Sequence, residues 1–262
     1  MTNIEITILG FSIIFIMTTL GSAVVFMFKG DISHRTNSIL LGFAAGIMIA
    51  ASVWSLLLPS ISQSASLGSL NWLPASVGFI IGGLFLVVID KLVPHIHSGT
   101  GEEEGPHTHL KKSAKLFLAV TIHNIPEGLA VGFAFGAASV AGDTASYMAA
   151  LGLAIGIAVQ NFPEGAAVSL PMRKATRSKK RAFWYGTGSG AVEPVAAIAG
   201  YFLSSQLSEL QPWFLAFAAG AMIFVVAEDL IPDANIVENT HTGTWGVMLG
   251  FVVMMILDVA LG

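Results

Sequence analysis

The chain has 262 residues, of which 54% are hydrophobic and only 11% are charged, with a formal net charge of -4. Soluble globular domains have about a quarter of their residues charged, so this composition excludes an ordinary water-soluble fold. The absence of cysteine excludes disulfides and thiolate metal ligands, which leaves imidazole, carboxylate, amide and thioether groups as the ligands available to a metal.

Apolar stretches of about 20 residues, the length that crosses a bilayer, follow one another along the chain with short polar breaks between them. We predict eight spans, at 4–28, 38–61, 72–94, 115–139, 145–171, 182–205, 212–232 and 244–261. Backbone groups in lipid must be hydrogen-bonded within the protein, and no stretch alternates apolar and polar residues as a strand would. The sequence therefore predicts an all-α, polytopic membrane protein with a single transmembrane domain over residues 1–262.

The basic residues are unevenly distributed over the breaks. They lie after span 1, between spans 3 and 4 and after span 5, while the breaks after spans 2, 4 and 6 contain no Lys or Arg. Basic loops tend to stay in the cytoplasm. We therefore expect a multi-pass protein of the cell (inner) membrane with both termini outside the cytoplasm and a cytoplasmic loop at 95–114. The first basic residue is Lys29, so the first stretch reads as a retained span and not as a signal peptide.

A first internal repeat links spans 2 and 7. Residues 43–49 read Phe-Ala-Ala-Gly-Ile-Met-Ile and residues 217–223 read Phe-Ala-Ala-Gly-Ala-Met-Ile, and each copy is followed about a dozen residues later by a proline, Pro59 or Pro232. The expected topology makes these two spans enter the membrane from opposite sides. Such a pair is typical of transporters built from an inverted repeat, although small residues also recur wherever helices pack closely.

A second repeat places polar residues in the middle of two apolar spans. It reads His-Asn-Ile-Pro-Glu-Gly in span 4 and Gln-Asn-Phe-Pro-Glu-Gly in span 5. Because residues four apart share a helix face, His123 lies over Glu127, and Gln160 lies over Glu164. Each of these two hexads therefore offers two ligand groups to one point in the membrane.

The prolines of the hexads, Pro126 and Pro163, cannot donate a backbone hydrogen bond, so we expect a loosened helix that lines a cavity. Imidazole, carboxylate and amide groups together suit zinc, iron(II), manganese or cadmium better than copper(I). Magnesium fits less well, because it prefers oxygen ligands and water.

Carboxylates lie within or at the ends of several spans. They are Asp90, Glu127, Glu164, Glu193, Glu228, Asp229 and Asp258. Placing an ionised Asp at the centre of a span costs roughly 2.5 to 3.5 kcal/mol on insertion scales, so these groups need protons or metal cations as counter-charges. Taken alone, Glu193 could equally be a protonated residue that packs helices together.

The break between spans 3 and 4 is rich in histidine. It contains His95, His97, His107 and His109, with a run of three glutamates at 102–104. Such a tract is typical of segments that capture or release metal. A solvated loop with incidental histidines would read the same way.

The two hexads, with their surroundings, resemble the ZIP (Zrt/Irt-like) family of metal transporters, in particular its bacterial members, over nearly the whole chain. The resemblance implies eight helices in a 3+2+3 arrangement, with helices 1–3 and 6–8 related by inversion. It also implies a binuclear metal site between helices 4 and 5, and a homodimer.

By matching motif, the resemblance assigns residues to both metal sites. The first site would be formed by His123, Glu127, Gln160 and Glu164, with Met48 where the Ala-Gly-x-Met pattern matches. The second would be formed by Asn124, Asn161 and Glu193, with Glu127 and Glu164 bridging. Taken by itself, Met48 could also be a packing residue.

The resemblance also assigns residues to the two ends of the path. Glu228 and Asp229 stand where many family members have His-Glu, so an exit-side role is implied with an altered metal preference. Asp90 and Asp258 would line the entrance or exit, and His95 and His97 match histidines just past helix 3.

These patterns predict a transporter of divalent transition metals, with zinc first and iron, manganese or cadmium as further cargo, and the resemblance implies that the metal is taken into the cytoplasm. The metal would be substrate and not cofactor, and the partners would be the metal and the bilayer, with no nucleic acid. One alternative is a proton-coupled carrier of an organic solute, which leaves the ligand spacing unexplained. Another is an intramembrane metallohydrolase, but its usual His-Glu-x-x-His motif is absent and amide ligands activate water poorly. We therefore expect a protein that is not an enzyme.

Overall fold

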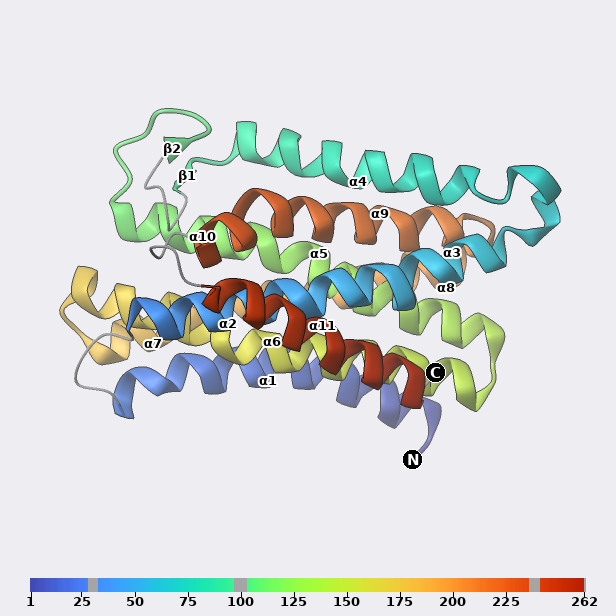
Figure 1. Cartoon of the computed structure of the whole chain (residues 1–262), viewed down its shortest axis with the longest axis horizontal. Coiled ribbons are helices and arrows are strands. Elements are labelled where there is room, and N and C mark those ends of the chain that lie inside the picture. Colours follow the sequence, from blue (N-terminus) through green and yellow to red (C-terminus); the bar gives the residue numbers. More distant parts are fainter. Residues whose placement is uncertain (28–32, 97–102, 236–240, 262) are drawn as a thin grey trace.

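The structure is a computed structural model of the whole chain and describes residues 1–27, 33–96, 103–235 and 241–261. Long helices lie along the longest axis of the molecule (Figure 1). The first half contains α1 (Asn3–Met27), α2 (His34–Ala51), the π-helical η1 (Ser52–Leu57), α3 (Leu58–Gln63), the 3-10 helix η2 (Ala65–Leu70), α4 (Leu73–Leu92) and α5 (Lys112–Ala141). The second half contains α6 (Thr144–Thr176), α7 (Lys179–Gly190), α8 (Val192–Gln206), the 3-10 helix η3 (Ser208–Leu210), α9 (Gln211–Val225), the π-helical η4 (Val226–Leu230), α10 (Ile231–Asn235) and α11 (Thr242–Leu261).

Between α4 and α5 lies a small antiparallel hairpin. It pairs β1 (His95–Ile96) with β2 (Glu103–Glu104), and His95 stands opposite Glu104. This hairpin holds the start of the predicted histidine-rich loop against the end of the helical bundle, where His95 is buried.

In the part of the chain that the structure describes, seven helical segments are long and apolar enough to cross a membrane. The prediction of an all-α, polytopic membrane protein is therefore confirmed. The sixth predicted span, 182–205, is divided at Ala191 into α7 and α8, of 12 and 15 residues. Pro194 explains the break, because it cannot donate to the carbonyl of Gly190 one turn earlier. The count of eight spans stays a prediction.

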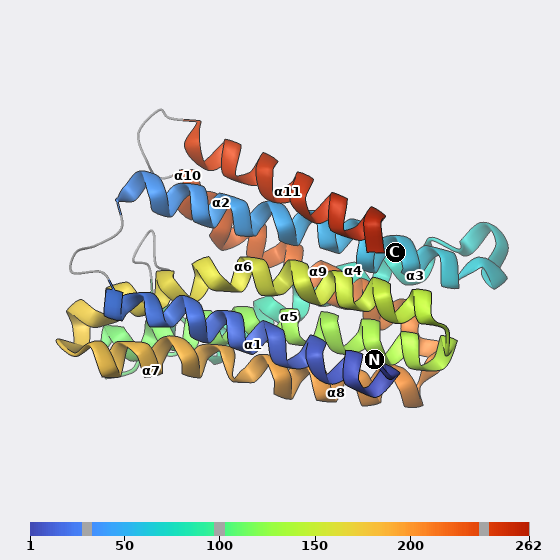
Figure 2. The ribbon, with the colours of Figure 1, turned by 90° about the horizontal axis from the view of Figure 1, so that it is seen from below.

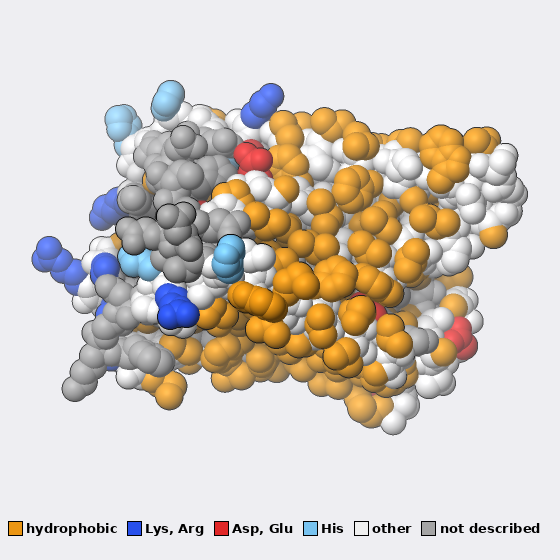
Figure 3. All heavy atoms as spheres, viewed as in Figure 1, with side chains coloured by type: hydrophobic (Ala, Val, Ile, Leu, Met, Phe, Trp, Pro, Cys, Tyr) orange, Lys and Arg blue, Asp and Glu red, His pale blue; other side chains and the backbone are white. Residues whose placement is uncertain are grey.

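The surface matches a membrane setting. In Figure 3, hydrophobic side chains cover the middle of the visible face, and most of the basic and histidine side chains gather at one end of the molecule. On α4, Ile80, Leu84 and Val88 are exposed, as residues that contact lipid would be. We call the end of the bundle with these basic residues the basic end.

Close packing pairs the helices. Figure 2 shows α2 and α11 on one side of α6, with α1, α7 and α8 on the other. A Cβ added to Gly46 of α2 would lie 2.1 Å from the Val247 carbonyl oxygen of α11, and one added to Gly220 of α9 would lie 1.9 Å from the Phe79 carbonyl oxygen of α4. Gly46 and Gly220 occupy the same position of the first repeat, so both copies use it to approach a partner helix.

The partner helices α4 and α11 repeat each other as well, a signal that we missed in the sequence. In each of these helices two glycines lie four residues apart, and an aspartate follows the second glycine by eight residues. The residues are Gly78, Gly82 and Asp90 in α4, and Gly246, Gly250 and Asp258 in α11. A Cβ at Gly82 or at Gly250 would lie 2.0 Å from the carbonyl oxygen of Phe217 or of Phe43, respectively. These two phenylalanines open the two copies of the first repeat, so the packing supports an inverted relation between predicted spans 2 and 3 and predicted spans 7 and 8.

The irregular turns are not where the prolines of the hexads led us to expect them. Helices α5 and α6 continue as α-helix through Pro126 and Pro163. Instead, each copy of the first repeat runs into a π-helical turn, η1 after α2 and η4 after α9. Such turns widen a helix locally and are frequent at functional sites.

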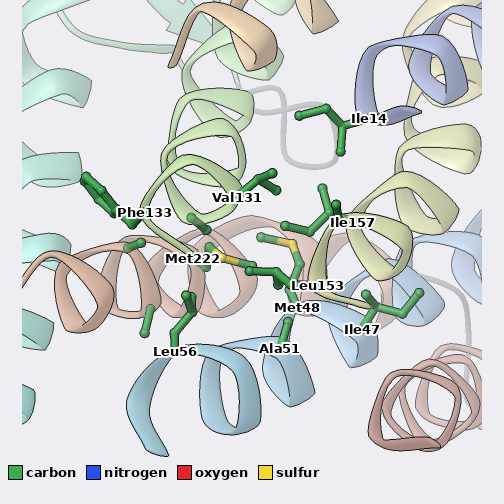
Figure 4. Close-up of a cluster of buried hydrophobic side chains, with 14 of the residues drawn as sticks. Ile14, Ile47, Met48, Ala51, Leu56, Val131, Phe133, Leu153, Ile157 and Met222 are labelled. Atoms are coloured by element: carbon green, nitrogen blue, oxygen red, sulfur yellow. The ribbon is translucent and has the colours of Figure 1, made fainter. Parts of the chain in front are cut away.

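A layer of fully apolar side chains fills the space between α1, α2, η1, α5, α6 and α9 (Figure 4). Among its residues are Ile14, Ile47, Met48, Ala51, Leu56, Val131, Phe133, Leu153, Ile157 and Met222. None of these side chains is more than 2% exposed, so this apolar layer is shielded from solvent.

Candidate metal site

A cavity of about 70 Å³ lies where α2, α5, α6 and η4 meet, and we call it the site cavity. Its polar and sulfur-containing lining residues are Met48, His123, Glu127, Glu164, Asp229 and Asp233. A water molecule takes up about 30 Å³ in the liquid, so the space suits an ion with one or two waters. The structure thus brings four of the five predicted first-site residues to one cavity.

The fifth, Gln160, is fully buried, and its Nε2 donates to Asn161 Oδ1 at 2.6 Å. Its Oε1 has no hydrogen-bond partner, and neither has Glu127 Oε2 or Asn124 Oδ1. A buried acceptor without a donor costs about 1 to 3 kcal/mol. The two hexads hold three such oxygens, and a bound cation would give each of them the partner that it lacks.

A second cluster surrounds Glu193 of α8, which is fully buried. Its Oε1 accepts from Asn124 Nδ2 at 3.2 Å, and its Oε2 accepts from Asn161 Nδ2 at 2.6 Å. Oε1 also accepts from the hydroxyl of Thr18 on α1 at 2.9 Å. The three residues predicted for the second site are therefore in direct contact, and Glu193 is hydrogen-bonded by both hexads.

The glycine that ends each hexad places these groups. A Cβ at Gly128 of α5 would lie 2.3 Å from the Glu193 carbonyl oxygen, and one at Gly165 of α6 would lie 2.1 Å from the Thr18 carbonyl oxygen. Because glycine has no side chain, α8 and α1 approach the two hexad helices to backbone contact. The side chain of Glu193 can therefore reach the asparagines.

Asp229 comes from the π turn η4 and meets His123, with Nε2 and Oδ2 3.1 Å apart. The residue expected at the exit therefore reaches the first predicted site. Its neighbour Glu228 is exposed and does not line the site cavity, because adjacent residues of a helix point about 100° apart.

The remaining predicted residues lie at the two ends of the bundle. At the basic end, His95 Nε2 lies 3.5 Å from Asp90 Oδ1, and His95 Nδ1 is 2.8 Å from the Val93 carbonyl oxygen. His97 lies outside the described residues. The C-terminus lies toward the opposite end (Figure 1), and Asp258, in the last turn of α11, accepts from the hydroxyl of Ser55 with its Oδ1.

Asp258 and Ser55 line a second cavity, of about 460 Å³, which we call the distal cavity. Its other lining residues include Trp54, Gln63, Ser146 and Ala149. Both cavities are bounded by α5, α6 and α9, and on α6 a residue of the apolar layer, Ile157, lies between their lining residues.

Across the described ranges, no three His, Asp or Glu side chains are arranged to hold a metal ion by themselves. An ion at the hexads therefore needs amide oxygens, the thioether of Met48 or a rotation of side chains. The predicted ligand set contains amide oxygens and the Met48 thioether besides the imidazole and the carboxylates.

Sequence reasoning missed three residues of this region. A lone threonine in an apolar span is common, so nothing in the sequence singled out Thr18, and the same holds for Ser55. Asp233 could have been found, because it directly follows the Ile-Pro pair that ends the second copy of the first repeat.

Taken together, the fold and site define a class: multi-pass helical membrane proteins in which imidazole, amide and carboxylate groups surround a small cavity, as in a cation transporter. Comparison with known proteins identifies the family. Residues 113–258 match the family model described as ZIP Zinc transporter, and the chain belongs to this family.

Relatives from distant organisms are similar over almost the whole chain. The human zinc transporter ZIP11 is 38% identical over 94% of each chain. The zinc transporter ZIPB of Bordetella bronchiseptica is 36% identical over 99% of this chain and 82% of its own. The zinc transporter ZupT of Chlorobaculum parvum is 33% identical over 91% of each.

Proposed function

We propose that this protein carries zinc across the membrane into the cytoplasm through two adjacent sites between α5 and α6. Family membership supports divalent metal transport, with zinc as the transported substrate and not a cofactor. One observation carries the assignment of the site: the buried oxygens of Glu127, Gln160 and Asn124 that have no donor in the protein.

The first site would be formed by His123, Glu127, Gln160 and Glu164, with Met48 facing them across the site cavity. Asp229 would hold the imidazole when the ion is absent and could join the ligands at the cytoplasmic side. This mixed nitrogen and oxygen set suits zinc and also iron(II), manganese and cadmium, which we propose as further cargo.

The second site would be formed by Asn124, Asn161 and Glu193, with the hexad glutamates bridging the two ions. The direct contacts of both asparagines with Glu193 support this assignment. When an ion leaves, we propose that the glutamates take up protons, because ionised carboxylates are costly inside the membrane.

The order of residues along α6 supports a path through the bundle. Ala149 lines the distal cavity, Ile157 belongs to the apolar layer and Glu164 lines the site cavity. Helix α5 runs in the opposite direction, so along it come first the site cavity, then the apolar layer at Val131 and then the distal cavity. Transport would proceed by alternating access, in which the apolar layer opens while the path closes at the other end.

The site cavity extends toward the basic end, since its lining includes Ala119 and Val120, which precede the first hexad on α5. Because basic ends tend to face the cytoplasm, we propose that this conformation is open to the inside. Both termini would then lie outside the cytoplasm, in a cell (inner) membrane protein with one domain over 1–262 and a cytoplasmic loop at 95–114.

The test is metal flux into liposomes that contain the purified protein. We expect zinc flux, competed by cadmium, iron(II) and manganese, and measured at two internal pH values to reveal any proton exchange. His123→Ala and Glu127→Ala should each reduce zinc flux at least about tenfold, the scale on which lost ligand contacts act. Glu209→Ala changes an exposed carboxylate of η3 and serves as the control.

No metal-dependent flux, or unchanged flux in both site variants, would sink the proposal. Metal-independent uptake of an organic solute that follows a proton gradient would favour a proton-coupled carrier. Cleavage of a peptide or lipid that depends on Glu127 would favour a metallohydrolase. We infer a carrier and not an enzyme, because the hexads lack a second histidine and offer amides, which activate water poorly.

A homodimer is also proposed, on the family resemblance alone. Light scattering of the purified protein, corrected for bound detergent, would give a mass of twice 27.4 kDa if the dimer forms.

A further inference from the structure

Thr18 reaches the second site from a helix that contributes none of the predicted ligands. Its side chain is 1% exposed, and its hydroxyl lies 2.9 Å from Glu193 Oε1 and 3.1 Å from the Ile14 carbonyl oxygen one turn earlier. A hydroxyl has one hydrogen to donate. A carboxylate is the stronger acceptor, because hydrogen bonds to an ionised group are about twice as strong as neutral ones.

The packing of α1 fixes the direction of this hydroxyl. The Thr18 carbonyl oxygen lies against Gly165 of one hexad, as the Glu193 carbonyl oxygen lies against Gly128 of the other. The methyl group of Thr18 packs at Gly190, where an added Cβ would be 2.7 Å from it. With the backbone and the methyl group both held, the hydroxyl faces Glu193.

The contact has a consequence for the asparagines. While both Asn124 and Asn161 donate their Nδ2 atoms to Glu193, Asn124 Oδ1 is left without a hydrogen-bond partner. That arrangement turns an amide oxygen toward an ion only if the Glu193 carboxylate stays in place. Thr18 supplies a third donor to that carboxylate, from outside the two hexad helices.

We propose that Thr18 is a positioning residue of the second metal site: its hydroxyl fixes the carboxylate of Glu193 so that Asn124, which donates to that carboxylate, presents its side-chain oxygen to the ion. The inference rests on the proposed two-site function and adds α1 to it. The first site should not depend on Thr18, because Thr18 is not among the residues that line the site cavity.

The experiment is a calorimetric titration of the purified full-length protein in detergent with Cd²⁺ and, separately, with Zn²⁺. The binding event that Glu193→Gln removes defines the second site. Thr18→Val replaces the hydroxyl with a methyl group of similar size. It should weaken that event by about 10- to 100-fold, the usual effect of losing a hydrogen-bond partner of a metal ligand, and leave the first event unchanged.

Two further variants separate positioning from folding. Thr18→Ser keeps the hydroxyl and should restore the affinity of the second event. Thr19→Val is the matched control, since Thr19 is the next residue of α1 and its buried hydroxyl has no hydrogen-bond partner; both binding events should stay as in the unchanged protein. Thermal unfolding without metal reports any general loss of stability.

The outcomes distinguish this inference from the function on which it rests. If the unchanged protein shows no binding event for either metal, the proposed site fails. If it shows two events and Thr18→Val retains both, or weakens both equally, Thr18 does not position the second site. Should Thr18→Val be too unstable to purify, Thr18→Ala is compared with Thr18→Ser, and equal second-site affinities would overturn the inference.

Discussion

The asparagine of each hexad does something that a carboxylate could not. An amide both donates and accepts, so Asn124 and Asn161 can give hydrogen bonds to Glu193 and still offer oxygen to an ion. An aspartate at either position would only accept, and it would add a charge whose insertion into the membrane costs roughly 2.5 to 3.5 kcal/mol. The amides therefore limit the negative charge that the bundle must hold when no ion is bound.

Asp143 gives a residue-scale prediction outside the membrane. It caps the start of α6, where its carboxylate accepts from the Ser146 backbone N–H at 2.9 Å and from the Ser146 hydroxyl at 2.8 Å. These hydrogen bonds, the one from the backbone first, lower the pKa of Asp143 below its ordinary value. A lowered folded-state pKa adds stability above the unfolded pKa of about 3.9, and this stability is lost as the pH falls through the folded-state value.

Asp143→Ala should therefore lower the thermal midpoint of the purified protein at about pH 7, and the difference from the unchanged protein should shrink as the pH falls below about 3.9. Asp143→Asn keeps an acceptor at the helix start and should lower the midpoint less. A difference that is the same at neutral and acid pH would show that the charge has no part in the cap.

The ligand residues could be predicted where two signals coincided: a polar residue deep in an apolar span, and its repetition in a second span. Both hexads satisfied the two conditions, and their residues meet around Glu193 and the site cavity. Thr18 met only the first condition, since no second span repeats it, and its role depends on the contact of α1 with Glu193 of α8. The contact of Asp229 with His123 could not be predicted from the sequence either, because the π turn η4 sets the direction of the Asp229 side chain.

At the scale of elements, glycine contacts set the distance between helices. Gly82→Ala in α4 would bring a methyl group within 2.0 Å of the Phe217 carbonyl oxygen of α9. Overpacking of this kind costs about 1 to 3 kcal/mol, so we expect a lower thermal midpoint and reduced zinc flux. If α4 and α11 are equivalent, Gly250→Ala should have the same effect.

The adjacent Gly83 is the matched control for this prediction. Its nearest neighbour would be Phe224 Cδ2 at 3.7 Å, an ordinary contact. Gly83→Ala should leave the midpoint unchanged or raise it, since alanine favours helix by about 1 kcal/mol over glycine. Equal midpoints for the Gly82 and Gly83 variants would contradict the packing described for α4 and α9.

Hydropathy was sufficient to find the helices, because lipid allows few other structures and the polar breaks are short. It could not locate η1 or η4, since a π turn does not interrupt an apolar run. The break at Ala191 was likewise hidden within one apolar stretch, although Pro194 was a visible signal for it.

At the scale of the whole molecule, the absence of cysteine permits a direct test of the two cavities. Ala149 lines the distal cavity and Ala167 lines the site cavity, so each can be changed to the single cysteine of the chain. A membrane-impermeant thiol reagent should label Ala149→Cys from outside the cell and Ala167→Cys from the cytoplasmic side of inverted vesicles.

Ala154→Cys is the control, because this residue is fully buried on α6, between the distal cavity and the site cavity. It should resist the reagent from either side. Labelling of Ala149→Cys and Ala167→Cys from the opposite sides would reverse the proposed orientation. Labelling of Ala154→Cys from outside would show that the apolar layer does not close the path.

The two π turns also bear on how the halves of the chain diverged. Pro59 follows Gly46 by 13 positions, whereas Pro232 follows Gly220 by 12, and η1 has six residues where η4 has five. A one-residue insertion in an ordinary helix would rotate everything beyond it by about 100°, but a wide turn absorbs the extra residue locally. Each half could therefore gain or lose a residue there during evolution while its glycine face and its proline end kept their alignment.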